Sequence, residues 1–287
     1  MDWRLVVAKK ALAARVPFGD ALRYAKRRRV GYRPDLGNLE TTLENYADIH
    51  AAALRAGRPV AGARVLEVGS GWFPLIPILL CLDGAREVVM TDLNRHMDEI
   101  TFSAAIDYLR ESYPERTALH DIRRLSDLPL RYLAPFAPAD VTDGSVDLVV
   151  SRTVLEHIEP DPLVALLGAL RPKLAAGGRM VHLVDHSDHL QHIDRGLSPV
   201  NFLSWDTGRH RLVNRLIGEG ENRLRHHQYP PLFERAGLDL VFDQGAPHPA
   251  TLASLRGLKL APPFDGMSAE QLSVLVSMYA LKAAGAP

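Results

Sequence analysis

The strongest structural signal in this chain of 287 residues is the stretch Val65-Leu66-Glu67-Val68-Gly69-Ser70-Gly71-Trp72-Phe73. It begins as a short aliphatic run typical of a buried strand, and glycines follow at once. Glycines at this point allow a tight turn and let a ligand approach the backbone, while the next helix presents its N-terminus to that ligand. The stretch therefore predicts a strand, a ligand-binding loop and a helix in succession.

Similar aliphatic runs recur along the chain and alternate with helical segments. We expect further strands at 87–92, 117–121 (a weak third strand), 146–151 and 179–184. Helices are expected at roughly 74–82, 94–113, 161–175 and 229–236, and two late runs, 238–243 and 272–281, suit a hairpin-like pair at the sheet edge. Alternating strands and helices predict an α/β fold with a mostly parallel sheet covered on both faces.

An acid follows the second strand, as in proteins that bind a nucleoside. Asp92 lies 21 residues after Gly71, where a carboxylate accepts both hydroxyls of a ribose. Dinucleotide-binding proteins require a third glycine, which would fall at Pro74. Proline adds bulk and lacks an N–H at that position, so the dinucleotide interpretation is rejected.

The sequence resembles the class I S-adenosylmethionine-dependent methyltransferases, specifically members acting on small molecules. Four segments carry the resemblance in the expected order: 65–71, Val89-Met90-Thr91-Asp92-Leu93-Asn94, 143–158 and 170–179. The resemblance implies a Rossmann-like, mostly parallel sheet of seven strands and S-adenosylmethionine as the cofactor. Phe73 stands where many members have a third glycine, so the loop is bulkier here, and this keeps open the alternative of a non-catalytic cofactor-binding protein.

The same resemblance assigns roles to residues near the cofactor. Backbone groups of the glycine loop face its amino-acid end, Asp92 binds the ribose and Leu93 packs on the adenine. Asp121, expected at the end of the third strand, is the candidate for the adenine amino group, or alternatively a helix N-cap. The predicted cofactor-binding set is Glu67, Gly69, Ser70, Gly71, Asp92, Leu93, Asp121, Ser151 and Arg152.

Histidines gather after the fifth strand: seven of the twelve lie within 182–227. Methyl transfer to a hydroxyl requires removal of a proton, and histidine titrates near neutral pH. We therefore predict His157, His186 and His189 as catalytic or acceptor-orienting residues, with oxygen as the favoured nucleophile. Simple capping or solvent-exposed histidines are the alternative.

A metal site is a further interpretation of this segment, although no metal is predicted. Its candidate ligands match no strict metal-binding motif. They are Asp185, Asp188, His189, His192 and Asp194.

The formal net charge is zero, but it is unevenly distributed. Residues 1–33 carry a balance of +8 and the remainder −8. We expect a basic helical extension or lid over 1–57, and a methyltransferase domain over 58–287 with a histidine-rich, acceptor-side insertion at about 186–227. A solvated helix face is the simplest interpretation of the basic segment; it also suits an anionic small-molecule acceptor, or peripheral membrane contact through Trp3, Leu5, Val6, Leu12 and Val16. Nucleic acid is not an expected partner, because the whole chain lacks a basic field.

Cysteine content and hydropathy suggest where the protein works. The single cysteine, Cys81, excludes an internal disulfide and sits in an apolar run shorter than a membrane span. No secretory signal is visible at the N-terminus. A cytoplasmic protein is the simplest expectation.

Overall fold

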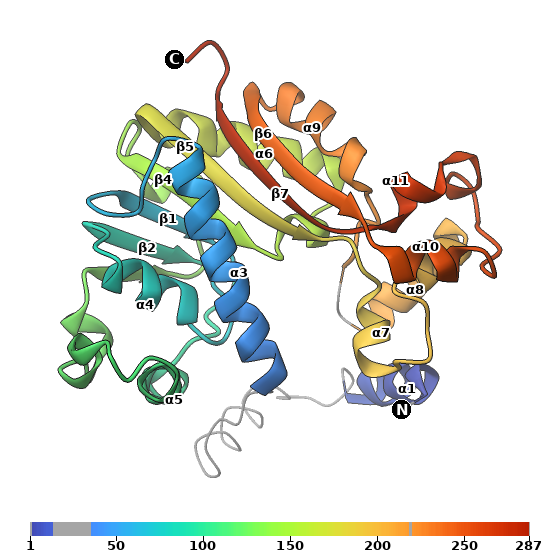
Figure 1. Ribbon diagram of the computed structural model, residues 1–287, viewed down its shortest axis with the longest axis horizontal. Helices are drawn as coiled ribbons and strands as arrows, with labels where there is room; N and C mark the ends of the chain where they lie inside the picture. Colours follow the sequence, from blue (N-terminus) through green and yellow to red (C-terminus); the bar gives the residue numbers. More distant parts are fainter. Residues whose placement is uncertain (1, 14–35, 218–219, 287) are drawn as a thin grey trace.

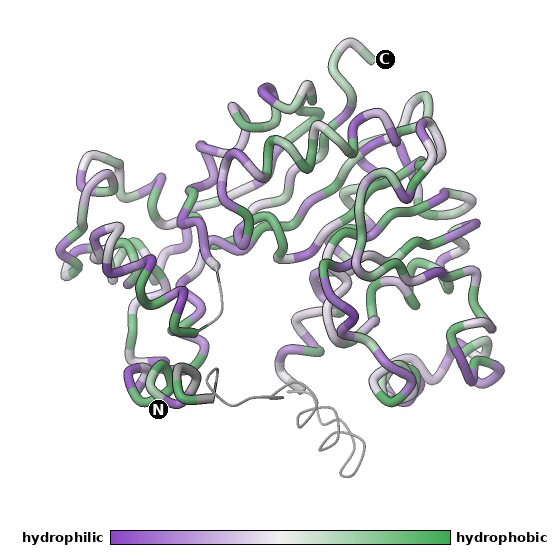
Figure 2. Tube along the Cα trace, turned by 180° about the vertical axis from the view of Figure 1, so that it is seen from behind, coloured by the Kyte–Doolittle hydropathy of each residue, from purple (hydrophilic) through white to green (hydrophobic). Residues whose placement is uncertain are grey.

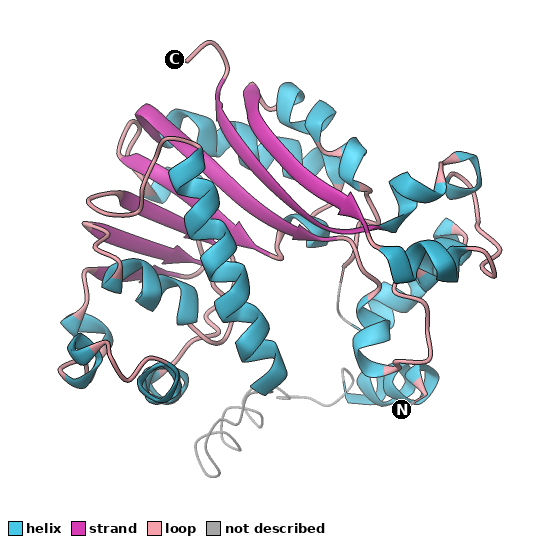
Figure 3. Ribbon diagram, in the orientation of Figure 1, coloured by secondary structure: helices cyan, strands magenta, loops and turns pink. Residues whose placement is uncertain are grey.

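A computed structural model describes residues 2–13, 36–217 and 220–286. Its centre is a seven-stranded sheet in the order β3-β2-β1-β4-β5-β7-β6, with β7 antiparallel to both its neighbours and the other pairs parallel. Figure 3 shows the twisted sheet between its helices. The strands are β1 (Arg64–Val68), β2 (Glu87–Thr91), β3 (Leu130–Leu133), β4 (Val146–Arg152), β5 (Leu174–Asp185), β6 (Leu238–Pro247) and β7 (Val274–Ala283). The predicted α/β fold and the late strand pair are confirmed.

Successive residues of the central strands pack into two different cores. In β1, Val65 joins the core beneath α3, α4 and α5, whereas Leu66 joins the core beneath α6 and α9. This alternation is the period of two that a strand buried on both faces requires. The covering helices are α3 (Leu36–Arg55), α4 (Leu75–Leu82), α5 (Glu99–Ser112), α6 (Pro160–Leu170) and α9 (Pro230–Arg235).

Helix α3 belongs to the sheet-covering layer. It runs across one face of the sheet (Figure 1), and Ile49 and Ala53 are fully buried in the same core as β1. The sequence analysis placed this helix in an N-terminal extension ending at residue 57. Its packing instead joins it structurally to the strands that follow.

The third strand lies further along the chain than expected. Residues Thr117–His120 form a short 3₁₀ helix, and β3 pairs with β2 from Leu130 onward. In the expected run only Leu119 is buried, so that run lacks the repeated apolar contacts a strand needs. Asp121 is consequently an exposed residue after a 3₁₀ turn, and the strand-end position that motivated its cofactor role is wrong.

Beside the sheet lies a third hydrophobic cluster, separate from its two cores. We call this part of the molecule the helical lobe and define it as residues 2–13, 188–217 and 249–273. Its centre is Trp205, whose ring lies 5.3 Å from that of Trp3, together with the buried Phe202. Figures 1 and 2 show the lobe as a separate group of helices next to the sheet. It contains α1 (Trp3–Ala13), α7 (His189–Ile193), α8 (Thr207–Ile217), α10 (Pro249–Leu255) and α11 (Ala269–Ser273). The expected insertion therefore forms only part of the lobe, which also contains residues 2–13 and the segment between β6 and β7.

A buried arginine links this lobe to the sheet. Arg225 is fully buried and donates to the carbonyl oxygens of His186 (2.7 Å), Leu272 (3.0 Å) and Val274 (2.6 Å). One guanidinium therefore joins the end of β5 to the start of β7. Because a buried charge must keep its partners, these contacts fix the lobe's attachment.

Helix α1 packs against the lobe with part of its apolar surface. Trp3 contacts Trp205 and Val7 is buried, whereas Leu5 and Leu12 are exposed. Val16 and the basic run 26–29 lie outside the described residues. Among the helices that the structure describes, none is long and apolar enough to cross a membrane.

Candidate active site

The glycine loop lies at the carboxyl end of β1, between β2 and β4, where the strand order reverses. This is the usual ligand-binding position in open α/β sheets. The N–H groups of Gly69 and Ser70 both donate to the carbonyl oxygen of Thr91 at 2.9 Å, so the loop folds back over β2. Gly69 has a φ of 74°, and a Cβ there would lie 2.5 Å from Cγ2 of Val154. Only glycine fits this contact between the loop and the chain after β4.

Asp92 holds the other side of the loop. Its carboxylate accepts the N–H of Gly71 at 3.0 Å and the N–H of Leu93 at 2.7 Å, and His96 Nε2 lies 3.6 Å away. A carboxylate has about four lone-pair positions, so Asp92 still has acceptor capacity for hydroxyl groups. The predicted pairing of the glycine loop with this acid is present, and Leu93 beside it is 78% exposed at the rim.

Glu67 is buried beneath the loop. It is 4% exposed and accepts the hydroxyl of Ser70. Its pKa is raised to about 7, chiefly by burial and also by the Asp92 carboxylate, against the lowering effects of the Ser70 hydrogen bond and Arg152. Its carboxyl group is therefore poised to change ionisation when a cation arrives.

Glu67 and the loop residues Gly69, Ser70 and Gly71 line a cavity of about 290 Å³. Trp72 and Phe73 form part of its wall, which accommodates the bulk that the sequence analysis found at the third glycine position. Asn38, Leu39 and Thr42 of α3 also line it, and sequence reasoning missed them because α3 was assigned to the extension.

A second cavity of about 580 Å³ adjoins the first. Arg152 and Thr153, at the end of β4, line both cavities together with Asn38. Thr153 has a φ of 51°, an unfavourable conformation for a β-branched residue that is typical of functional sites. The second cavity is otherwise lined by Gly37, Thr41, Asn45, Leu183, Asp185, Gln191, His192, Arg195 and Val276.

Arg152 and Ser151 have different environments although they are neighbours. Burial lowers the pKa of Arg152, while Glu156, Asp185 and Glu67 raise it, and its Nε has no hydrogen-bond partner in the described parts of the chain. Ser151 is buried and shares a hydrogen bond of 2.8 Å with His182 inside the sheet. Of the predicted cofactor-binding set, Glu67, Gly69, Ser70, Gly71 and Arg152 line the first cavity, and Asp92 and Leu93 adjoin it through the hydrogen bond from Gly71 to Asp92. The side chain of Ser151 faces the core, and Asp121 lines neither cavity.

The three predicted catalytic histidines separate into two environments. His186 is buried: its Nδ1 donates to the carbonyl oxygen of Leu224 at 3.0 Å, so its Nε2 accepts the hydroxyl of Ser277 at 2.7 Å. Burial lowers the pKa of His186 well below the usual range, so it remains neutral and structural. The prediction that His186 faces the acceptor is wrong, because both of its ring nitrogens form hydrogen bonds within the core.

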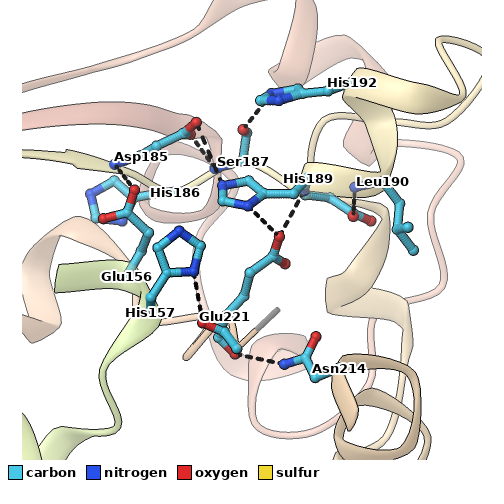
Figure 4. A network of polar contacts seen from close by, with 12 residues as sticks. Glu156, His157, Asp185, His186, Ser187, His189, Leu190, His192, Asn214 and Glu221 are labelled. Carbon is cyan, nitrogen blue, oxygen red and sulfur yellow. Dashed lines mark hydrogen bonds and ion pairs between the residues drawn. The ribbon is translucent and has the colours of Figure 1, made fainter. Parts of the chain in front are cut away.

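His157 and His189 lie together beside the second cavity, with ring centroids 5.0 Å apart (Figure 4). Nδ1 of His157 donates to the carbonyl oxygen of Gly220 at 2.9 Å. Nδ1 of His189 lies 3.0 Å from Oε1 of Glu221, and its Nε2 lies 3.8 Å from Oδ2 of Asp185. Sequence reasoning missed Glu221, for which no motif gives a signal.

The ligand set considered for a metal does not converge in the described structure. Asp188 caps α7 by accepting the N–H of Leu190 at 2.9 Å, and burial raises its pKa to about 6. Asp194 accepts the N–H of Trp3 at 3.2 Å. These two acids are therefore occupied in fixing the lobe.

Comparisons with known proteins identify the family to which this fold belongs. A family model described as a methyltransferase domain matches residues 40–241, and the chain belongs to that family. It is a class I S-adenosylmethionine-dependent methyltransferase, and S-adenosylmethionine is its cofactor. No curated protein shows significant sequence similarity to it.

Solved structures give only a likeness of fold. An S-adenosylmethionine-dependent methyltransferase from Mesorhizobium loti is 18% identical, with 81% of this chain and 97% of that chain covered and a TM-score of 0.46. The 1,6-didemethyltoxoflavin-N1-methyltransferase of Burkholderia thailandensis is 15% identical, with 94% and 91% covered and a TM-score of 0.49. Magnesium protoporphyrin IX methyltransferase from Synechocystis is 12% identical, with 95% and 98% covered and a TM-score of 0.48.

We predict that Gly69→Ala destabilises the protein more than Gly57→Ala. Both glycines have positive φ, 74° and 77°, so both variants carry about 1–2 kcal/mol of backbone strain. Nothing lies within 4 Å of a Cβ at Gly57, whereas a Cβ at Gly69 meets Val154. We expect an additional loss of about 1–3 kcal/mol for Gly69→Ala from overpacking, measured by urea unfolding. Equal losses would contradict this, and Val154→Ala added to Gly69→Ala should restore part of the stability.

Glu67 gives the cofactor-free protein a defined pH dependence. Its folded pKa of about 7 lies above the ordinary 4.5, so the folded state binds more protons and stability falls as pH rises between those values. Glu67→Gln should match the wild type near pH 4.5 and exceed its unfolding free energy by about 3 kcal/mol at pH 8. Urea unfolding at both pH values measures this, and a pH-independent difference would show that the burial argument is wrong.

Proposed function

We propose that this enzyme transfers a methyl group to an oxygen atom of a small molecule bound in the second cavity. The observation that carries the proposal is the shared wall: Asn38, Arg152 and Thr153 line both cavities. An acceptor in the second cavity therefore lies next to the methyl donor in the first. Holding two reactants in contact is the main contribution that a protein makes to such a displacement.

The residues of the first cavity fit the cofactor. Apart from its chain neighbours, no described residue lies within 4 Å of the position that a Cβ would take at Gly71, so the loop backbone is open to a ligand there, and Arg152 Nε is a buried donor without a hydrogen-bond partner in the described chain. In this proposal Asp92 accepts the ribose hydroxyls and Glu67 pairs with the cationic amino group, through the loop formed by Gly69, Ser70 and Gly71. Leu93 packs on the adenine from the rim.

S-adenosylmethionine supplies a methyl group on a sulfonium sulfur, which leaves with the bonding electron pair when an acceptor oxygen forms the new C–O bond. The hydroxyl proton must then have an acceptor. Asp185 lines the second cavity, and its Oδ2 lies 3.8 Å from Nε2 of His189. We assign proton acceptance to Asp185, and orientation and polarisation of the acceptor oxygen to His157 and His189.

The helical lobe covers the acceptor side. Helix α7 contributes Gln191 and His192 to the second cavity, and Arg195 follows it. Arg195 and Arg152 place two guanidinium groups around the acceptor, which favours one that carries a negative charge. The basic segment of residues 1–33 would strengthen this preference.

The cofactor assignment predicts that Asp92→Ala weakens S-adenosylmethionine binding by roughly 100-fold or more. Hydrogen bonds to a charged group are worth about 1.5–3 kcal/mol each, and two ribose hydroxyls lose their acceptor. Calorimetry with S-adenosylmethionine and with S-adenosylhomocysteine measures the effect. Asp92→Asn, which keeps one acceptor oxygen, should lie between the alanine variant and the wild type. Unchanged affinity in Asp92→Ala would place the cofactor elsewhere.

The acceptor assignment predicts that Asp185→Asn lowers the rate of methyl transfer and spares cofactor binding. Loss of a proton acceptor costs about 10²–10⁴-fold in kcat. A panel of phenols, alcohols, carboxylates and amines assayed for S-adenosylhomocysteine release provides the substrate, and calorimetry provides the control. Activity confined to amines, or unaffected by Asp185→Asn, would exclude the proposed oxygen chemistry.

A further inference from the structure

Three metal-ligating side chains converge beside the second cavity. Glu156 and His157 belong to a short 3₁₀ helix, η4 (Leu155–His157), just after β4, and His189 is the first residue of α7. One ligand atom from each lies within 4.8 Å of the other two. Figure 4 shows the two imidazole rings close together in an edge-on arrangement, with Glu156 and Asp185 near them. A single cation fits between ligand atoms at such separations.

The outer contacts orient both imidazoles for coordination. A carbonyl oxygen only accepts, so the bond from His157 to Gly220 places the proton on Nδ1 and the lone pair on Nε2. In neutral His189 the contact of Nδ1 with Glu221 has the same consequence. Metal-binding histidines characteristically donate their other N–H to a carbonyl or a carboxylate in this way.

The surroundings of Glu156 independently indicate a place for a cation. It is 4% exposed, and its Oε1 accepts the N–H of Asp185 at 3.3 Å. Its Oε2 is buried without a hydrogen-bond partner in the described chain. A buried carboxylate oxygen without a partner is expensive unless a cation binds it.

We propose that Glu156, Nε2 of His157 and Nε2 of His189 bind one divalent transition-metal ion. Two imidazoles and a carboxylate suit Zn²⁺, Fe²⁺ or Co²⁺, whereas Mg²⁺ prefers oxygen ligands alone. Three protein ligands leave at least one coordination position open, as in catalytic metal sites. Asp185 Oδ2, 3.8 Å from His189 Nε2, lies on the side of the second cavity.

The site's role rests on the proposed function, whereas the binding of the metal does not. Asp185 lines the second cavity and also contacts both Glu156 and His189, so the metal position adjoins the acceptor. A cation there would bind the acceptor oxygen and lower the pKa of its hydroxyl. His157 and His189 would then polarise the acceptor through the metal, and Asp185 would still take the proton.

Cobalt titration of the metal-depleted full chain tests the binding. We expect one Co²⁺ per chain, with visible absorption from imidazole coordination, displaced by Zn²⁺ and not by equimolar Mg²⁺. Glu156→Gln, His157→Gln and His189→Gln should each abolish the spectrum. Glu221→Gln, which removes only the orienting charge, should weaken binding by roughly 10–100-fold. His192→Gln is the matched control: this ring stacks on His189 at 5.5 Å but lies outside the ligand set, so its variant should bind like the wild type.

Failure of this inference is distinguishable from failure of the proposed function. Calorimetry with S-adenosylhomocysteine on the metal-free protein and on each variant shows that the cofactor site is folded. Intact cofactor binding without cobalt binding, or cobalt spectra that survive all three ligand substitutions, would overturn the metal site. Stoichiometric cobalt binding with methyl transfer unaffected by metal removal would confirm the site and remove its role in acceptor activation.

Discussion

The close approach of Gly69 to Val154 is the constraint on which the functional part of the molecule depends. It presses the loop after β1 against the chain leaving β4, with no space for a Cβ. Residues 152–157 are thereby held at the loop's edge, and they supply a wall of both cavities, a strained Thr153 and two members of the metal-ligating cluster. The cofactor site and the proposed acceptor and cation sites therefore all adjoin one short segment, because parallel strands end at the same edge of the sheet.

The electrostatics at the glycine loop and at the His157–His189 pair favour cationic ligands. Arg152 is influenced by Glu67, Glu156 and Asp185, and Glu221 lies behind His189. Carboxylates therefore outnumber the guanidinium among these residues, and burial raises the pKa of Glu67 and of Glu156. A sulfonium cofactor with a cationic amino group relieves this at the glycine loop, and a divalent cation would do so at His157 and His189. The cofactor site and the proposed cation site therefore share one desolvated acidic environment.

How far the sequence predicts this molecule depends on how local each signal is. β1, β2, β4 and β5 are buried on both faces, so their aliphatic runs are continuous and visible, whereas β3 is a four-residue edge strand with one buried residue. The pairing of the glycine loop with Asp92 follows from chain spacing alone. The environments of His186 and His189 do not follow from chain spacing, because the residues that orient their rings, Ser277 and Glu221, come from distant segments. The lobe is also non-local, since three separated segments build its core.

The uneven charge of the chain can be related to two helices, one at the start of the basic segment and one that follows it. Helix α1, at its start, packs on α7 and α8 of the lobe, and α7 contributes His192 to the acceptor cavity. Helix α3, which follows it, lines both cavities through Asn38. Of the segment with a balance of +8, residues 2–13 therefore pack on the lobe that supplies part of the acceptor cavity, and most of its basic residues lie outside the described parts of the chain. Within the proposed function, positive charge in this segment would favour an anionic acceptor, whereas cofactor binding belongs to the sheet edge.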